Sequence, residues 1–192
     1  MYLSNDAALL CAICVSVYWS IVMVKAVLIT PKIGKAPNVI PKEALGLFSR
    51  LIMLPLILFW IIYPWYAAWM FPSTYPIIAG LGGLGCVIAL ALTIYCWHYM
   101  GSSWRIGIDP KEKNILITDG PFSKIRHPIY ALSMLLMLSS WLAVQTHAMF
   151  IIFCIHWALF TLEAYREEQY LCETHGASYQ AYMAKTCRFF PL

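Results

Sequence analysis

Apolar runs of membrane-spanning length are the feature that most constrains this chain. Residues 7–29, 47–68 and 77–100 are almost continuously apolar, and a helix needs about 20 such residues to cross a bilayer. Hydrophobic residues make up 61% of the 192 residues and charged residues only 11%, whereas roughly 25% of residues are charged in soluble domains. The sequence therefore predicts an integral membrane protein.

Two further apolar segments follow the longest polar segment, residues 101–126. A fourth predicted span begins at Pro128, which suits the first turn of a helix, and ends near residue 144. The tight turn 145–148 leads into a fifth span that ends near residue 165. After Glu168 we expect a separate interfacial helix, broken at residues 175–176.

Three further sequence features complete the predicted secondary structure. The loop 30–42 contains three prolines and three lysines, so we expect it to end the first helix. The alternation of residue types in 114–118 predicts a short extended piece. The glycines within 80–85 predict close packing between helices.

The predicted fold class is an all-α integral membrane protein with about five transmembrane helices. None of the 13 Lys and Arg residues falls in the loops near 71–76 and 145–148, so the positive-inside rule places the amino terminus outside and the carboxyl terminus in the cytoplasm. We expect one membrane-embedded domain over residues 1–192. Residues 1–100 of this domain supply three helices, and residues 101–192 supply the polar loop, a helical hairpin and the carboxyl-terminal interfacial helices.

Other function classes find little support. The basic residues are spread over several loops, which does not favour a nucleic-acid site. Most of the seven cysteines lie in apolar runs, where small buried hydrophobic residues are expected rather than disulfides or metal ligands. Histidine and carboxylate residues near the fifth span have no third ligand at a suitable spacing, so no metal site is predicted.

A polar cluster is expected where the fourth span begins and the fifth ends, because a short turn makes these two helices antiparallel neighbours. Its members are Arg126, His127 and Tyr130 on one side and Glu163, Arg166, Glu167 and Glu168 on the other. Glu167 and Glu168 differ by about 100° around the helix, so they are not expected to act as a pair. A headgroup anchor at Arg126, a helix cap at His127 and a packing role for His156 are the alternatives to a catalytic cluster.

Several motifs in this region resemble one known family. They are Gly120, the run Arg126-His-Pro-Ile-Tyr130, Glu167-Glu168, Leu171, Gly176, Tyr179, Tyr182 and the run Arg188-Phe-Phe-Pro191. In this order they are similar to the isoprenylcysteine carboxyl methyltransferase family of membrane enzymes, which is related to the phospholipid methyltransferases. The resemblance covers about the last ninety residues.

The resemblance implies S-adenosylmethionine as cofactor, in a cytoplasmic pocket formed by helices four and five and the carboxyl-terminal segment. It implies cofactor contacts at Asn114, Ile115, Leu116, Ile117, Phe122, His127, Pro128, Ile129, Tyr130 and Glu167, and catalytic roles for Arg126, Glu163 and Glu167. Two positions depart from the family: Phe122 replaces a usual Tyr, and Glu163 replaces the Arg found in enzymes that methylate a prenylcysteine carboxylate.

The expected function is methyl transfer from S-adenosylmethionine to a lipid-like or isoprenylcysteine-type carboxylate substrate at the membrane. The expected partners are this cofactor, a lipophilic or prenylated substrate and membrane lipids, without nucleic acid. Because Glu163 is acidic, methylation of a phospholipid amine or of a small thiol is an alternative reaction. A non-catalytic lipid-binding membrane protein is the alternative from a different class.

Overall fold

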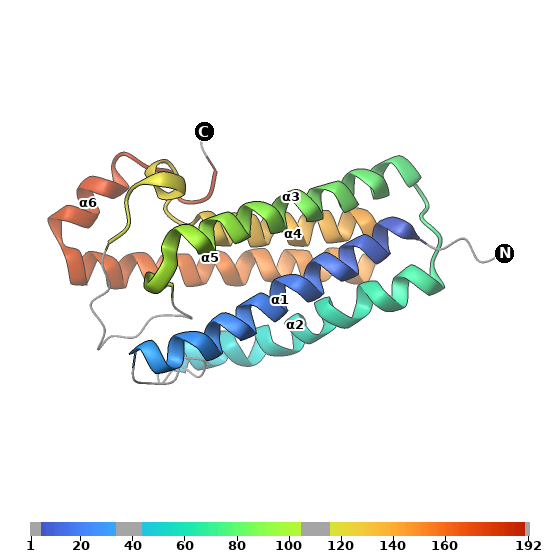
Figure 1. Cartoon of the computed structure of the whole chain (residues 1–192), viewed down its shortest axis with the longest axis horizontal. Helices are drawn as coiled ribbons and strands as arrows, with labels where there is room; N and C mark the ends of the chain where they lie inside the picture. The colour runs from blue at the N-terminus through green and yellow to red at the C-terminus, as the bar shows by residue number, and fades with distance from the viewer. Residues whose placement is uncertain (1–4, 34–43, 105–115, 191–192) are drawn as a thin grey trace.

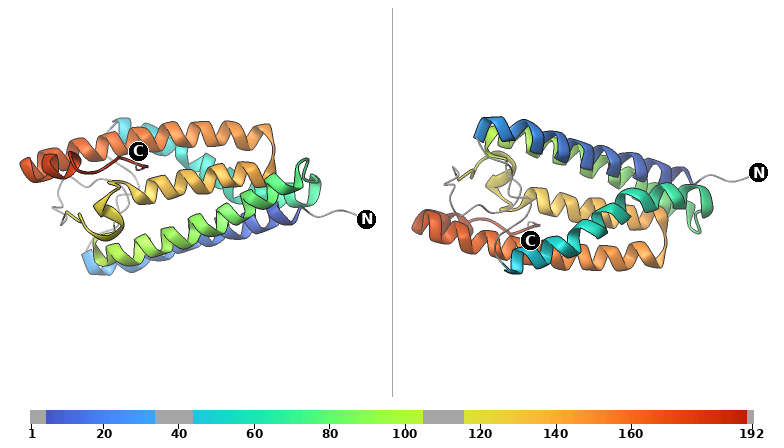
Figure 2. Two further views of the ribbon diagram at one scale, coloured as in Figure 1. Left: turned by 90° about the horizontal axis from the view of Figure 1, so that it is seen from above. Right: turned by 90° about the horizontal axis from the view of Figure 1, so that it is seen from below.

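Helices make up nearly all regular structure in the computed structural model, which describes residues 5–33, 44–104 and 116–190. These residues form the helices α1 (Asp6–Ile33), α2 (Ala44–Met70), α3 (Pro76–Met100), α4 (Pro128–Val144), α5 (His147–His175) and α6 (Ala177–Met183), and the 3-10 turns η1 (Gly101–Ser103) and η2 (Gly120–Ser123). Helices α1 to α5 lie side by side along one axis (Figures 1 and 2). The predicted all-α fold is confirmed for the described residues, which contain one isolated bridge and no named strand.

Four of these helices, α1, α2, α3 and α5, are long and apolar enough to cross a membrane. Helix α4 has 17 residues and is therefore about 26 Å long at 1.5 Å per residue, which is slightly less than the roughly 30 Å of a hydrocarbon core. The chain is thus a multi-pass membrane protein. The count of five spans stays a prediction, because it depends on α4.

The five helices alternate in direction, which gives the bundle two different ends (Figure 1). At one end α4 begins, α5 finishes, and η2 and α6 lie beside them; we call this the site end. At the other end lie residues 71–75 and the turn 145–146; we call this the turn end. The antiparallel pairing of α4 and α5 agrees with the sequence prediction.

Glycines bring α3 close to α4. A Cβ atom on Gly82 would lie 2.4 Å from the backbone nitrogen of Ala143, and one on Gly85 would lie 2.4 Å from the hydroxyl of Ser139. A Cβ atom on Gly80 would meet nothing within 4 Å. The predicted packing role is therefore confirmed at Gly82 and Gly85, where the helix backbones approach too closely for any side chain.

Buried polar side chains pair with one another in the middle of the bundle. Trp60 Nε1 donates to Ser140 Oγ at 3.0 Å, and His156 Nε2 lies 3.3 Å from Ser133 Oγ. The ring of His156 also contacts Phe160, with centroids 4.3 Å apart. His156 is 1% exposed, so the structure favours the packing role considered from the sequence.

Two predicted boundaries were wrong. Helix α1 continues through Pro31 to Ile33; the missing N–H of this proline leaves one carbonyl, that of Val27, without its intrahelical partner. Helix α5 continues to His175 instead of ending near residue 165, since no helix breaker precedes Gly176. Residues 116–118 of the predicted extended piece have no regular structure, and its first two residues lie outside the described ranges.

Candidate functional site

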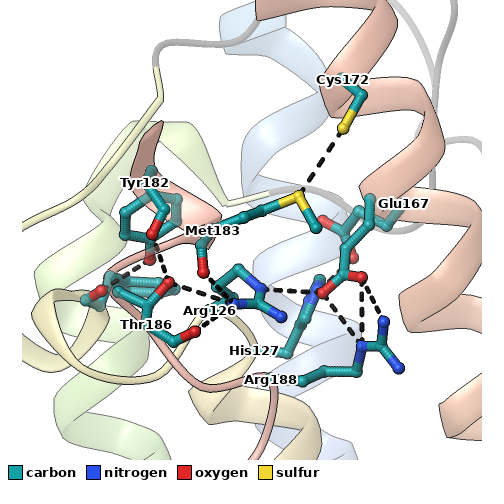
Figure 3. Close-up of polar contacts among 10 residues, drawn as sticks. Arg126, His127, Glu167, Cys172, Tyr182, Met183, Thr186 and Arg188 are labelled. Carbon is teal, nitrogen blue, oxygen red and sulfur yellow. Dashed lines mark hydrogen bonds and ion pairs between the residues drawn. The ribbon is translucent and has the colours of Figure 1, made fainter. Parts of the chain in front are cut away.

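A buried carboxylate, Glu168 on α5, is the centre of the polar cluster at the site end. Its side chain is 5% exposed, and its oxygens lie 2.9 Å from Arg126 Nε and 2.6 Å from Arg188 Nη2. Figure 3 shows the two arginines, which come from different segments of the chain. A carboxylate at this depth needs charged or hydrogen-bonding partners to offset its desolvation. Glu168 therefore joins three segments: the start of α4, the end of α5 and the chain after α6.

The guanidinium of Arg126 donates hydrogen bonds to other groups of the protein. Besides Glu168, its Nη1 atom reaches the Met183 carbonyl at 3.0 Å and both the carbonyl and the hydroxyl of Thr186. The side chain is 10% exposed. This arrangement fixes the guanidinium to the carboxyl-terminal segment and favours a positioning role over direct contact with a substrate.

Backbone hydrogen bonds attach the same segment to the start of α4. The amides of Arg126 and His127 donate to the carbonyls of Cys187 and Arg188 at 2.8 and 3.0 Å, and the Cys187 amide donates to the Lys124 carbonyl at 2.9 Å. We call residues 184–190 the tail. These bonds form the parallel bridge between Ile125 and Cys187, so the tail is held by the backbone as well as by ion pairs.

Arg188 closes the outer side of the cluster. Its Nε lies 3.1 Å from both oxygens of Glu168, and its guanidinium lies over the Tyr165 ring, 3.7 Å from the centroid. Hydrogen bonds to the Glu168 carboxylate raise the pKa of Arg188 above its usual value. The tail thus carries a fixed positive charge that belongs to the ion-pair network.

His127, the residue before α4, lies between the two adjacent carboxylates. Its Nδ1 is 3.6 Å from Glu167 Oε2, and its Nε2 is 3.3 Å from Glu168 Oε1. The second contact is within ion-pair distance, but the Nε2 atom is buried and has no hydrogen-bond partner among the described residues, because distance alone does not align a hydrogen bond. The imidazole stacks on Tyr130 with an interplanar angle of 5°.

Glu167 and Glu168 play different roles, as the helical angle predicts. The Glu167 side chain is 36% exposed, whereas Glu168 is buried among cations. Glu167 is therefore the carboxylate available to a bound molecule, and Glu168 is the one that holds the protein together.

A second set of contacts fixes η2 over the site end. The Tyr182 hydroxyl on α6 donates to the Phe122 carbonyl at 2.6 Å, and burial raises the pKa of Tyr182 to about 12. Gly120, at φ 55°, lets the chain turn against the Tyr99 ring, which a Cβ atom would approach to 2.4 Å. The left-handed conformation and this close approach both explain the glycine.

Glu163 stands in a different group of contacts. Its carboxylate accepts a hydrogen bond from the Ser49 hydroxyl on α2. It also accepts from Arg166, one turn further along α5, whose Nη1 lies 3.0 and 2.9 Å from the two carboxylate oxygens. Arg166 and Glu163 are 12% and 14% exposed. The charge of Glu163 is thus balanced locally, by partners other than those that hold Glu168.

The remaining predicted site residues lie on both sides of η2. Leu116 and Ile117 are half-buried in the chain that leads to it, and Pro128 and Ile129 form the first turn of α4. Asn114 and Ile115 lie outside the described residues. Within the described ranges, no three His, Cys, Asp or Glu side chains gather in a group that could hold a metal ion.

Sequence reasoning missed the role of the tail. Glu168 was placed in the polar cluster, but Arg188 was noticed only as a motif member and Thr186 was not noticed at all. Two adjacent carboxylates on α5 and one Arg in a short aromatic tail were the available signals, but nothing in the residue order showed that the tail returns to the start of α4.

Comparison with known proteins gives two matches. A family model described as the isoprenylcysteine carboxyl methyltransferase (ICMT) family matches residues 81–173. The cobalt-zinc-cadmium resistance protein CzcN of Cupriavidus metallidurans is 26% identical over 127 residues, which cover 66% of this chain and 53% of that protein. The chain therefore spans about half the length of this curated relative.

The family match contains most of α3, all of α4 and α5 up to residue 173, and thus the helical side of the cluster with His127, Glu167 and Glu168. The match ends before α6 and the tail. Residues 81–173, slightly less than half of the chain, are therefore similar to the isoprenylcysteine carboxyl methyltransferase family.

Proposed function

We propose that this protein is an integral membrane methyltransferase that uses S-adenosylmethionine and binds it at the site end. One observation carries the proposal: His127, Tyr130 and Glu167, which the family resemblance assigns to the cofactor, lie in one cluster that also holds buried polar atoms without an aligned hydrogen bond. The family match over residues 81–173 supports methyl transfer as the type of reaction. We propose further that residues 1–192 act as one domain.

The residues present fit such a cofactor. Two buried polar atoms lack an aligned hydrogen bond within the described stretches of the chain: the Tyr179 hydroxyl, and His127 Nε2, which lies 3.3 Å from Glu168 Oε1. Such groups are costly unless something pairs with them. Glu167 adds a partly exposed carboxylate beside them. A molecule with hydroxyl or amino groups and a positive centre would satisfy all three.

Bound S-adenosylmethionine would supply a methyl group already activated on a positively charged sulfur. The tasks of the protein are then to hold the reacting atoms in line and to keep water out. We propose that Glu167 attracts the positive end of the cofactor, while the stacked His127 and Tyr130 orient its polar groups. Phe122, which is 8% exposed, shields the site from water on the η2 side.

Arg126 acts in this proposal by positioning the site. Its contacts to Glu168, Met183 and Thr186 hold the tail against the start of α4, and His127 follows it directly in the chain. Leu116, Ile117, Pro128 and Ile129 keep their proposed cofactor contacts, as do Asn114 and Ile115.

The acceptor is proposed to be lipid-like, and Glu163 to help select it. The balanced pair of Glu163 and Arg166 at the contact with α2 offers no free cation to a carboxylate. It suits a neutral or amine acceptor better than an isoprenylcysteine-type carboxylate, and Glu163 could accept the proton that an amine must lose. A small thiol is the other acceptor compatible with this pair.

We propose that the site end faces the cytoplasm. All 13 Lys and Arg residues fall outside the segments 51–104 and 127–165, and these segments contain the whole turn end. The positive-inside rule then places the turn end and the amino terminus outside. A water-soluble cofactor would enter from the cytoplasm and a lipid-like acceptor from the bilayer.

The test is calorimetric titration of the detergent-purified protein with S-adenosylmethionine and with its demethylated product. We expect binding by the wild type and a loss of at least about tenfold in Glu167→Gln, since a charge-assisted contact contributes about 1.5 to 3 kcal/mol. The matched control is Glu173→Gln, the same change at an exposed position of α5, which should bind normally. A folded wild type that binds neither ligand would favour the non-catalytic lipid-binding alternative.

The acceptor is tested separately by methyl transfer from labelled cofactor to three probes: a prenylcysteine, a phospholipid with a primary amine headgroup, and a small thiol. We expect the amine lipid to be the best acceptor of the wild type. Glu163→Arg should shift the preference toward the prenylcysteine carboxylate. A wild type that prefers the carboxylate would contradict the role given to Glu163 without affecting the cofactor site.

A further inference from the structure

A groove at the turn end is separate from the cluster described above. It has a volume of about 470 Å³ and lies between the first residues of α3, the end of α4 and the start of α5. Its apolar walls include Ile78, Trp141, Leu142 and Phe150. This volume is within the range of about 300 to 1,000 Å³ that small-molecule sites occupy.

Fixed backbone and aromatic contacts define the shape of the groove. Gln145, which ends α4 in the left-handed conformation at φ 58°, accepts a hydrogen bond from the Tyr75 amide at 2.9 Å and donates one to the Tyr75 carbonyl at 2.8 Å. The amide of Gln145 thus joins the start of α3 to the turn between α4 and α5. Trp141 and Phe150, with ring centroids 4.8 Å apart, form one wall.

The chemistry of the lining selects an uncharged, apolar ligand. No Asp, Glu, Lys or Arg among the described residues lines the groove, and His147 stands at its rim. The Gln145 side chain already uses one of its two N–H donors and accepts one hydrogen bond at Tyr75. A charged small molecule would therefore lose its hydration without gaining a charged partner, whereas a hydrocarbon chain has no hydration of this kind to lose.

The groove is continuous with the surface that faces lipid. Ile78 and Phe150 belong both to its lining and to the exposed apolar residues of α3 and α5, and their neighbours Ile77 and Ile151 are 82% and 57% exposed. In a membrane, this apolar surface is covered by lipid chains. The occupant that can enter the groove directly from its surroundings is therefore a chain of a bilayer lipid.

We propose that the groove at the turn end binds one acyl chain of a phospholipid from the adjacent leaflet, with the glycerol region of the lipid near His147 at the rim. This site does not depend on the proposed methyltransferase activity, because it lies at the opposite end of the bundle from Glu167 and His127. It makes the contact between α3 and the α4–α5 turn sensitive to lipid composition.

The experiment uses the full chain in phospholipid nanodiscs with a phosphatidylcholine probe that carries a photoreactive diazirine in the middle of one acyl chain. After irradiation, labelled peptides are identified by mass spectrometry. We expect labelling to concentrate on residues 141–150 and on the first turn of α3, at a level about tenfold above that on other lipid-facing positions.

Leu142→Trp should fill the groove and reduce this labelling to the level of the remaining surface. The matched control is Leu84→Trp, the same change at a lipid-facing position of α3 that is 55% exposed and does not line the groove. Ile78→Trp fills the groove from the opposite wall and decides the question if Leu142→Trp does not fold.

Two results would overturn the proposal. The first is uniform labelling along all lipid-facing helices of the wild type, which would mean ordinary contact with bulk lipid. The second is unchanged local labelling in a folded Leu142→Trp or Ile78→Trp variant. Preferential labelling by an isoprenoid diazirine that phospholipid does not displace would replace the acyl chain by a different apolar ligand.

Discussion

Replacing Glu168 by Gln is the sharpest perturbation of the site end, because it removes one charge from a buried network and keeps the shape of the side chain. Glu168 accepts from Arg126 at 2.9 Å and from Arg188 at 2.6 Å. Loss of one partner of a buried ion pair costs about 3 to 5 kcal/mol, since the remaining charges stay desolvated.

The lower end of that range applies here. Arg188 is 25% exposed and keeps its contact with the Tyr165 ring, so water and the aromatic face offset some of its loss. Arg126 keeps the Met183 and Thr186 carbonyls. We expect Glu168→Gln to weaken the attachment of the tail by about 3 kcal/mol, which corresponds to about a hundredfold rise in the population of the detached state.

Hydrogen exchange followed by mass spectrometry measures this directly, because amide exchange reports local opening. Peptides that contain the amides of Arg126, His127 and Cys187 should exchange about a hundredfold faster in Glu168→Gln. The matched control is Glu167→Gln at the partly exposed neighbour, where the change should stay within about threefold, as for surface substitutions of about 0.5 kcal/mol. Equal exchange in the two variants would refute the argument that Glu168 holds the tail.

Two other predictions concern packing and η2. Gly82→Ala should destabilise the bundle by several kcal/mol, because its methyl group would meet the backbone at Ala143, whereas Gly80→Ala should leave the melting temperature in detergent unchanged or slightly higher; similar losses in both would contradict the close approach. Tyr182→Phe should cost about 1 kcal/mol by removing the hydrogen bond to the Phe122 carbonyl, and it should speed exchange in η2 without lowering the global melting temperature. A global loss of stability would show that this bond supports more than η2.

The sequence was most informative where one physical factor dominates. Hydrophobic length predicted the long helices, and the short turn at residues 145–146 predicted the pairing of α4 with α5. The same pairing brought His127 close to Glu167 and Glu168, as expected. The short turn between the two helices makes such contacts predictable from residue order alone.

Contacts made by a segment that folds back onto a much earlier part of the chain could not be predicted in this way. The tail reaches Arg126 from 60 residues away, and nothing in its composition specifies the parallel pairing with residues 124–127. The partner of Glu163 was equally hidden, because Ser49 lies 114 residues earlier on α2. The error at Pro31 has a different cause: Pro31 lies two residues before the end of α1 and interrupts only one intrahelical hydrogen bond.

The tail also sets the order of events during biogenesis. Residues 184–190 leave the ribosome after all five long helices, and they complete the pairing with residues 124–127 only then. The helices can therefore insert and pack while Arg126 and Glu168 still lack the tail as a partner. Competence to bind a ligand at this end would follow packing of the helices as a separate step, and a released chain truncated before Arg188 would hold the five long helices with an unfinished site.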